Sequence, residues 1–255
     1  MISLKTPREI DSMRHNSRIV ANALQTMKQH AVPGVTTNDL NEIAEDYIRS
    51  QGAKPSFLGY IGYPASICAS VNDEVVHGIP NDRPLEGGDI LGIDVGANSD
   101  GFHGDGAITL PIGTISESAE RLLAVTRQAL DAGVNAAVPG ERLGDISHAI
   151  QTVIEAAGFS VVRALVGHGI GREMHEAPQV ANYGDPGRGV RLKPGMTLAL
   201  EPMVNVGSYE VELLEDQWTV VTVDGELSAH FEHTIAITEY GPIVLTVPDE
   251  EMKGP

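Results

Sequence analysis

The chain has 255 residues, with 20% charged and 42% hydrophobic residues, which excludes a wholly disordered protein and allows one large domain or two small ones. Its formal net charge of −18 argues against a nonspecific nucleic-acid binder. No apolar run reaches the roughly 18 residues of a membrane span. The early charges of Lys5 and Arg8 argue against a signal peptide. The single cysteine, Cys68, excludes an intramolecular disulfide and fits a reducing compartment.

Four helices are predicted, in two pairs. Thr6 and Glu9 form a capping box, and Pro7 suits the first helical position, so the first helix should begin near residue 7. The second helix should end at Gly52. A third helix should begin at Ser116 or Ser118, and a fourth should end at Gly158.

β-Branched or alternating segments between glycine, asparagine and aspartate residues predict eight strands. Asp224-Gly225 is typical of a hairpin turn. No low-complexity linker is present, so we expect a single domain over residues 1–255. The predicted strands are Ser66–Val71, Asp89–Ala97, Ala107–Ile112, Ser160–Val166, Met196–Val206, Trp218–Val223, Phe231–Thr238 and Ile243–Val247.

The sequence also indicates an internal duplication. The letters AVPG occur at 31–34 and again at 137–140, and Ala23-Leu24 matches Ala129-Leu130 at the same offset. Further on, the series Leu85, Gly88, Leu91, Asp94 aligns with Leu192, Gly195, Leu198, Glu201. Each half should therefore contain two helices followed by a strand that ends in a carboxylate, with the boundary near 112–116. Matching residues would converge on a pseudo-twofold axis.

Four acidic residues and one histidine stand in apolar or glycine-rich surroundings, where an unpaired charge is costly to bury. We expect Asp105 to open the strand after Asp94 and to lie beside it. Singly, each residue could be a turn cap or a structural histidine; together they suit divalent metals. Two ions would balance four negative charges and predict metal-assisted hydrolysis. The five residues are Asp94, Asp105, His168, Glu201 and Glu232.

The sequence closely resembles the type I methionine aminopeptidases over essentially its whole length. The resemblance implies the pita-bread fold, an α/β (α+β) architecture with pseudo-twofold duplication and a mostly antiparallel curved sheet covered by helices. The segments that carry it are VVHGIP (75–80), GHGIGREMHEAPQV (167–180), LEPMVN (200–205) and FEHT (231–234).

The resemblance implies that the five acidic and histidine residues bind two divalent metal ions, which could be Co, Mn, Fe, Ni or Zn. Asp105 and Glu232 would bridge both ions, Asp94 would bind one, and His168 with Glu201 the other. A monovalent cation beside Asn72 and Ser228, as in some relatives, is a weaker implication.

The resemblance also assigns substrate roles. His77 would hydrogen-bond near the scissile nitrogen, and His175 would stabilise the developing oxyanion. Glu201 would carry a proton from the attacking water to the leaving amine. We expect His103 and His233 to be structural. His230, which we place on the same strand face as Glu232, should line the site.

A pocket for methionine should be apolar and polarisable. Met174 stands where some relatives have an aromatic residue, so the sequence does not fix the shape of the pocket there. Leu165 departs from the aromatic residue or methionine that is usual at its position, and we expect this to affect packing more than chemistry. Ordinary core packing remains an alternative for Cys68 and Met174. The matching positions are Tyr60, Tyr63, Cys68, Met174 and Trp218, with Phe57 at the rim.

These implications predict a cytoplasmic monomer that acts on the N-termini of nascent polypeptides, transiently near the ribosome, without nucleic-acid specificity or membrane attachment. Two alternatives stay open. An Xaa-Pro-type aminopeptidase or creatinase shares the ligand order but carries a large additional N-terminal domain. A non-catalytic binding protein with this fold would have lost metal ligands, whereas here all five positions are filled.

Overall fold

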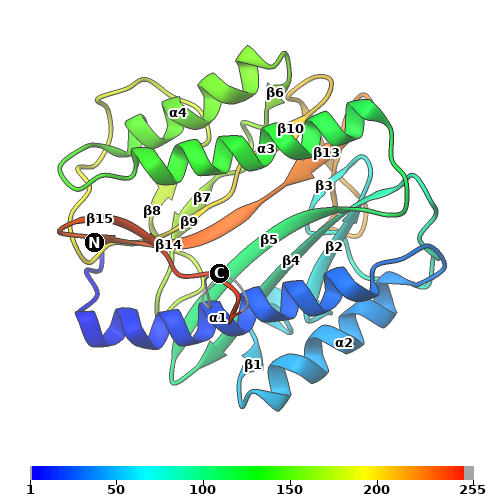
Figure 1. The fold of residues 1–255 in the computed structure, drawn as a ribbon, viewed down its shortest axis with the longest axis horizontal. Coiled ribbons are helices and arrows are strands. Elements are labelled where there is room, and N and C mark those ends of the chain that lie inside the picture. The colour runs from blue at the N-terminus through cyan, green and yellow to red at the C-terminus, as the bar shows by residue number, and fades with distance from the viewer. Residues whose placement is uncertain (1, 250–255) are drawn as a thin grey trace.

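The structure is a computed structural model that describes residues 2–249. Its four helices form two pairs, and strands β5 and β14 run between these pairs in the view of Figure 1. Within the described residues, no helix is long and apolar enough to cross a membrane. The helices are α1 (Pro7–His30), α2 (Thr37–Ser50), α3 (Glu117–Ala136) and α4 (Leu143–Ala156), with a short 3₁₀ helix at Tyr60–Gly62.

The main sheet has nine strands in the order β1-β4-β5-β14-β9-β7-β8, with β2 joined to β4 and β15 joined to β14. All of its strand pairs are antiparallel. Its strands are β1 (Lys54–Pro55), β2 (Ile67–Val71), β4 (Ile90–Ser99), β5 (Phe102–Pro111), β7 (Gly167–Gly169), β8 (Glu176–Val180), β9 (Thr197–Leu200), β14 (Glu232–Thr238) and β15 (Gly241–Val244).

Two three-stranded sheets lie beside the main one, in the orders β13-β10-β6 and β11-β12-β3. Their strands are β3 (Glu74–Val76), β6 (Ser160–Val161), β10 (Met203–Asn205), β11 (Val211–Leu213), β12 (Val220–Thr222) and β13 (Ser228–His230).

The predicted N-terminal caps of α1 and α3 and the predicted glycine ends of α2 and α4 are confirmed. Thr6 and Glu9 form the capping box of α1, and Ser116, not Ser118, caps α3. The predicted glycine ends are confirmed too, because Gly52 and Gly158 follow α2 and α4 with φ of +75° and +80°. These torsions are open to glycine without strain.

The internal duplication is visible in matched hydrogen bonds. The N–H of Gly34 donates to the carbonyl of Leu85 at 2.8 Å, and the N–H of Gly140 donates to that of Leu192 at 3.0 Å. The carboxylate of Asp39 accepts from the N–H of Thr36 at 2.8 Å, as Asp145 does from Arg142 at 2.8 Å. We call α1 to β5 the first half and α3 to β15 the second half.

Each half buries its own hydrophobic core between its helix pair and its part of the main sheet. Equivalent residues occupy equivalent places in the two cores. The matched pairs are Leu24 with Leu130, Leu40 with Ile146, and Leu91 with Leu198, all of which are buried.

Several strand predictions need correction. The segment 196–206 divides into β9 and β10 in different sheets, because Pro202 has no N–H with which to continue a ladder. Residues 160–166 form only the two-residue strand β6. Asp224-Gly225 does turn the chain, but the flanking β12 and β13 belong to different sheets, so the hairpin prediction is wrong.

Candidate metal centre and active site

The antiparallel pair β4–β5 brings the first two predicted ligands together. Asp94 lies opposite Ala107, and Asp105 lies opposite Gly96, so the two aspartates are diagonal neighbours on one face of the sheet. This confirms that they adjoin. Asp105 does not open its strand, however, because β5 begins at Phe102 and Asp105 lies inside it.

The second half supplies the other three residues, and the prediction that Asp94 ends its strand is wrong, because β4 continues to Ser99. Glu201 directly follows β9, as the predicted strand-end carboxylate, and Glu232 is the first residue of β14. Glu232 lies opposite Ala107 in the β5–β14 pair, and His168 lies opposite Ala199 in the β7–β9 pair. Five neighbouring strands thus direct their acidic and imidazole groups to one place where the halves meet.

The imidazole of His168 is oriented as a ligand. Its Nδ1 lies 2.9 Å from the carbonyl oxygen of Gly169, which can only accept, so Nδ1 carries the proton and Nε2 keeps its lone pair. Nε2 lies 3.7 Å from Oδ2 of Asp105 and 3.5 Å from Oε1 of Glu201. Ligand atoms of Asp105, His168 and Glu232 all lie within 4.8 Å of one another.

The surrounding protein groups do not provide hydrogen bonds or counter-charges for all of these carboxylates. Burial raises the pKa of Asp94 to about 7, and burial together with neighbouring carboxylates raises the pKa values of Asp105, Glu201 and Glu232. Burial lowers the pKa of His168 to about 4. Oδ1 of Asp94 and Oε1 of Glu232 are buried without a hydrogen-bond partner. Unpartnered carboxylate oxygens beside a neutral imidazole fit a divalent metal.

The two predicted substrate histidines lie beside this cluster. The ring centroids of His175 and His168 are 4.2 Å apart, and Nδ1 of His175 lies 2.8 Å from the hydroxyl oxygen of Tyr60. His77 follows β3 with φ of +60°, a left-handed conformation that is uncommon outside glycine. Burial, with a contribution from His175, lowers the pKa of His77 to about 4.

A cavity of about 320 Å³ joins the acidic cluster to an apolar pocket. Tyr63 and Trp218 meet edge to face there, with ring centroids 5.0 Å apart. All six predicted pocket residues line it: Phe57, Tyr60, Tyr63, Cys68, Met174 and Trp218. Leu165 also lines the cavity. Sequence reasoning missed the lining residues Ile61, Val76, Ala164, Val166 and Met203, which carry no distinctive chemistry.

The other three histidines named from the sequence, His103, His230 and His233, do not line the cavity; this was expected of His103 and His233, but His230 was expected to line the site. His103 is hydrogen-bonded to Ser56 and His233 to Thr246, and neither lines the cavity. His230 is buried, with Nε2 3.9 Å from Oε2 of Glu201, but it ends β13 while Glu232 begins β14. The expectation that His230 and Glu232 share one strand is therefore wrong, because Phe231 separates two strands that belong to different sheets.

Asn72 and Ser228, the positions matched to a monovalent-cation site, are adjacent in the structure. The N–H of Ser228 donates to the carbonyl oxygen of Asn72 at 2.9 Å, so one of the two lone pairs of this oxygen already accepts a hydrogen bond. The side chain of Asn72 is bonded to Asp89 and to the N–H of Ile90.

Comparison with known proteins places this geometry in a family. Residues 11–239 match the metallopeptidase family M24. The chain is 57% identical over 246 residues to methionine aminopeptidase 1 of Bacillus subtilis, a match that covers 96% of this chain and 99% of that protein.

Solved structures agree with this comparison. The methionine aminopeptidase from Rickettsia prowazekii has a TM-score of 0.96 and 44% identity, covering 97% of this chain and 100% of that one. The Thermotoga maritima enzyme has a TM-score of 0.95 and 48% identity, covering 96% and 99%. These likenesses confirm the predicted fold and the predicted use of divalent metal. The chain belongs to the metallopeptidase family M24.

Proposed function

We propose that this chain removes the N-terminal methionine from peptides and nascent proteins whose second residue is small. The observation that carries the proposal is a single cavity lined both by buried carboxylates and by aromatic and sulfur-bearing side chains. Methionine has a long, unbranched side chain whose sulfur interacts favourably with aromatic rings. Tyr63 and Trp218 offer such rings beside the acidic cluster, and Met174 adds a polarisable thioether.

The cluster would hold two divalent ions, since four ionised carboxylates carry a charge of −4. Asp105 and Glu232, which face each other across the meeting of the two halves, would hold the ions together with Asp94 from the first half and with His168 and Glu201 from the second. When bound, such ions act as Lewis acids that lower the pKa of water and polarise a carbonyl group. The ligand set of carboxylates and one imidazole suits Mn, Fe, Co, Ni or Zn alike.

His175 would act as a hydrogen-bond donor to the scissile carbonyl oxygen as negative charge develops on it. Burial lowers the pKa of His175, which keeps the imidazole neutral at pH 7. If the hydroxyl of Tyr60 donates to Nδ1, the ring proton is on Nε2 and is free to donate. A donor held in place before reaction stabilises an oxyanion without reorganisation.

Glu201 would move the proton. Burial raises the pKa of its carboxyl group, so this acid accepts a proton from water more readily than an exposed glutamate does. It lies between His168 and His230, at 3.5 and 3.9 Å, and these neighbours limit its movement. His77 would then hydrogen-bond near the leaving nitrogen.

The wider setting is also part of the proposal. We propose a cytoplasmic monomer that meets nascent chains near the ribosome, with a monovalent cation beside Asn72 and Ser228. The net charge of −18 supports the absence of nucleic-acid binding.

One experiment tests the proposal directly. Crystals grown with Mn²⁺ or Co²⁺ are measured for anomalous scattering, and the same protein is assayed on a Met-Ala peptide. We expect two anomalous peaks within the five-residue cluster and release of free methionine that a chelator abolishes. A single peak would contradict the dinuclear centre, and turnover after complete metal removal would contradict metal-dependent hydrolysis.

A further inference from the structure

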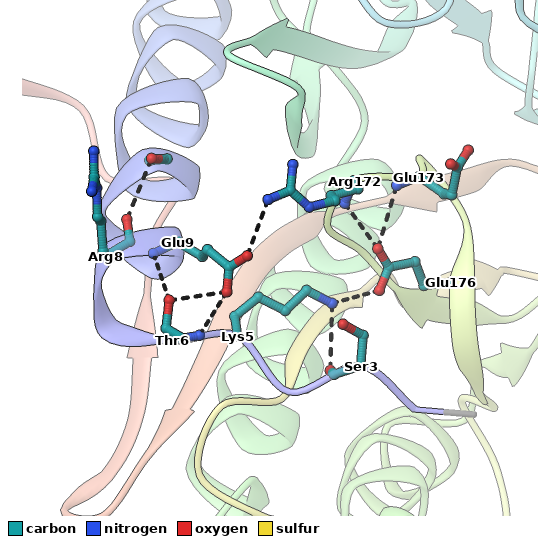
Figure 2. Close-up of polar contacts among 9 residues, drawn as sticks. Ser3, Lys5, Thr6, Arg8, Glu9, Arg172, Glu173 and Glu176 are labelled. Atoms are coloured by element: carbon teal, nitrogen blue, oxygen red, sulfur yellow. Dashed lines mark hydrogen bonds and ion pairs between the residues drawn. The ribbon is translucent and has the colours of Figure 1, made fainter.

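Glu176 follows His175 in the chain, and its carboxylate is hydrogen-bonded to the backbone of Arg172 and Glu173 (Figure 2). Its Oε1 accepts hydrogen bonds from the backbone N–H of Arg172, at 2.8 Å, and of Glu173, at 3.3 Å. The N–H of Gly171 donates to the carbonyl of Glu173 at 3.1 Å. One carboxylate therefore fixes the backbone between Gly171 and the start of β8.

The positive charge that faces this carboxylate comes from the segment before α1. Nζ of Lys5 lies 2.5 Å from Oε2 of Glu176, with side chains only 4% and 14% exposed. The N–H of Lys5 donates to the carbonyl of Gly195 at 2.7 Å. A Cβ on Gly171 would lie 2.4 Å from Cε of Lys5, so only glycine leaves room for the lysine there.

A lysine buried to this degree is unusual, because burying a charge costs free energy that surface residues do not lose. A second ion pair joins the first turn of α1 to the same loop without that burial. Arg172 lies 3.1 Å from Glu9, with side chains 63% and 30% exposed. Exposed pairs of this kind contribute little, so Arg172 offers a matched control for Lys5.

We propose that Lys5 is a positioning residue, which holds His175 and Met174 in place through the carboxylate of Glu176. This inference rests on the proposed role of His175 in the reaction. Neither Lys5 nor Glu176 lines the cavity, so both act through the loop.

Removing the lysine leaves a buried carboxylate without a counter-charge. Without the ammonium group the carboxylate turns toward water, which weakens its hydrogen bonds to the N–H groups of Arg172 and Glu173. A displacement of about 1 Å at a reacting group can lower a rate by about 10²-fold. His168 is next to this loop, because β7 pairs with β8 at Gly169 and Glu176, but that pairing uses backbone groups and should persist in the variant, so metal affinity should be unchanged.

The test compares Lys5→Met with Arg172→Gln in the metal-loaded enzyme, using a Met-Ala peptide. We expect Lys5→Met to lower kcat by about 10- to 100-fold, with KM within about threefold and metal affinity by calorimetry unchanged. Arg172→Gln should keep kcat within about twofold. The double variant Lys5→Met/Glu176→Gln should recover at least about tenfold, because an uncharged amide oxygen accepts the same N–H bonds without a counter-charge.

Wild-type kcat in Lys5→Met, an equal loss in Arg172→Gln, no recovery in the double variant, or a loss of metal affinity would each overturn the inference. If Lys5→Met does not fold by circular dichroism, the double variant is compared with Glu176→Gln, and the same recovery is expected. His175→Ala is assayed in parallel, since wild-type kcat in that variant would overturn the proposed role of His175 itself.

Discussion

The hydroxyl oxygen of Tyr60 lies 2.8 Å from Nδ1 of His175, and the two rings stack with centroids 5.4 Å apart. Tyr60 was predicted only as a wall of the methionine pocket. The structure adds a polar contact to a histidine that we propose as an oxyanion donor. The side chain of Tyr60 thus lines the methionine pocket and also contacts the histidine that we propose as the oxyanion donor.

Replacing Tyr60 with phenylalanine separates these two roles. The ring remains, so KM for a Met-Ala peptide should change little. Loss of the hydroxyl removes the hydrogen bond to Nδ1 of His175, so the ring proton is no longer held on Nε2. We expect kcat to fall about tenfold, on the scale of one hydrogen bond. Steady-state kinetics measure the split, with Tyr240→Phe as the control because Tyr240 is 98% exposed. A rise in KM with unchanged kcat would assign Tyr60 to the pocket alone.

Replacing Asp105 with alanine removes a carboxylate that we assign to both ions. Metal content by atomic emission should fall from two ions toward none, and turnover should drop by at least about 10³-fold, because water loses its activation. Glu239→Ala, which removes an exposed carboxylate, should leave both quantities unchanged. Retention of one tightly bound ion and substantial activity would show that Asp105 is not shared.

The metal-free protein should lose stability as the pH rises from 7.5 to 8.5. The raised pKa values of Asp94, Asp105, Glu201 and Glu232 mean that the folded state holds protons that the unfolded state has released. Stability then falls with increasing pH. Burial lowers the pKa values of His77, His168 and His233 to about 4 and that of His230 to about 3, so these four imidazoles are neutral in the folded state over this range. Below about pH 6.5, the lowered pKa of His168 acts in the opposite direction.

Urea unfolding midpoints at the two pH values measure this effect. Saturation with Mn²⁺ is the matched condition, because bound metal keeps the carboxylates ionised and should remove the decline. A metal-free protein that becomes more stable between pH 7.5 and 8.5 would contradict the raised pKa values.

The pocket should discriminate among N-terminal residues. Leucine lacks the length and sulfur of methionine, and a poor fit of this size costs about 1–3 kcal/mol, so kcat/KM for Leu-Ala should be about 10- to 200-fold lower than for Met-Ala. Met174→Ala enlarges the pocket and should reduce that ratio. Tripeptides under matched metal loading give the comparison, with Met-Ala set against Met-Lys. Faster cleavage of Ala-Pro would indicate an Xaa-Pro aminopeptidase, and equal rates for Met-Ala and Met-Lys would contradict a small second site.

The helices and the ligand positions could be predicted because their signals are local. Capping boxes and the repeated AVPG segment depend on residues near one another in sequence, and each carboxylate stood out against apolar neighbours. The three-residue strand around His168 could not be predicted, because it is too short for an alternating pattern and is flanked by glycine. The single-domain organisation stays a prediction.

The Lys5–Glu176 pair could not be predicted for a different reason. The two residues are 171 positions apart, and each alone is typical of an exposed surface. Only the packing of the segment before α1 against Gly171 and Gly195 brings them together. Long-range burial of ordinary charged residues leaves no mark in a single sequence.

The two halves of the main sheet meet where β5 and β14 share the register pairs Glu232 with Ala107 and His233 with Gly106. Asp105 lies on one side of this seam and Glu232 on the other. An ion bound by both carboxylates would therefore link the two halves of the main sheet. Amide hydrogen exchange at Gly106 and His233 should slow when metal is added, while amides deep in α2 and α4 keep their rates. Metal loading would thus govern how readily the molecule opens along its own line of duplication.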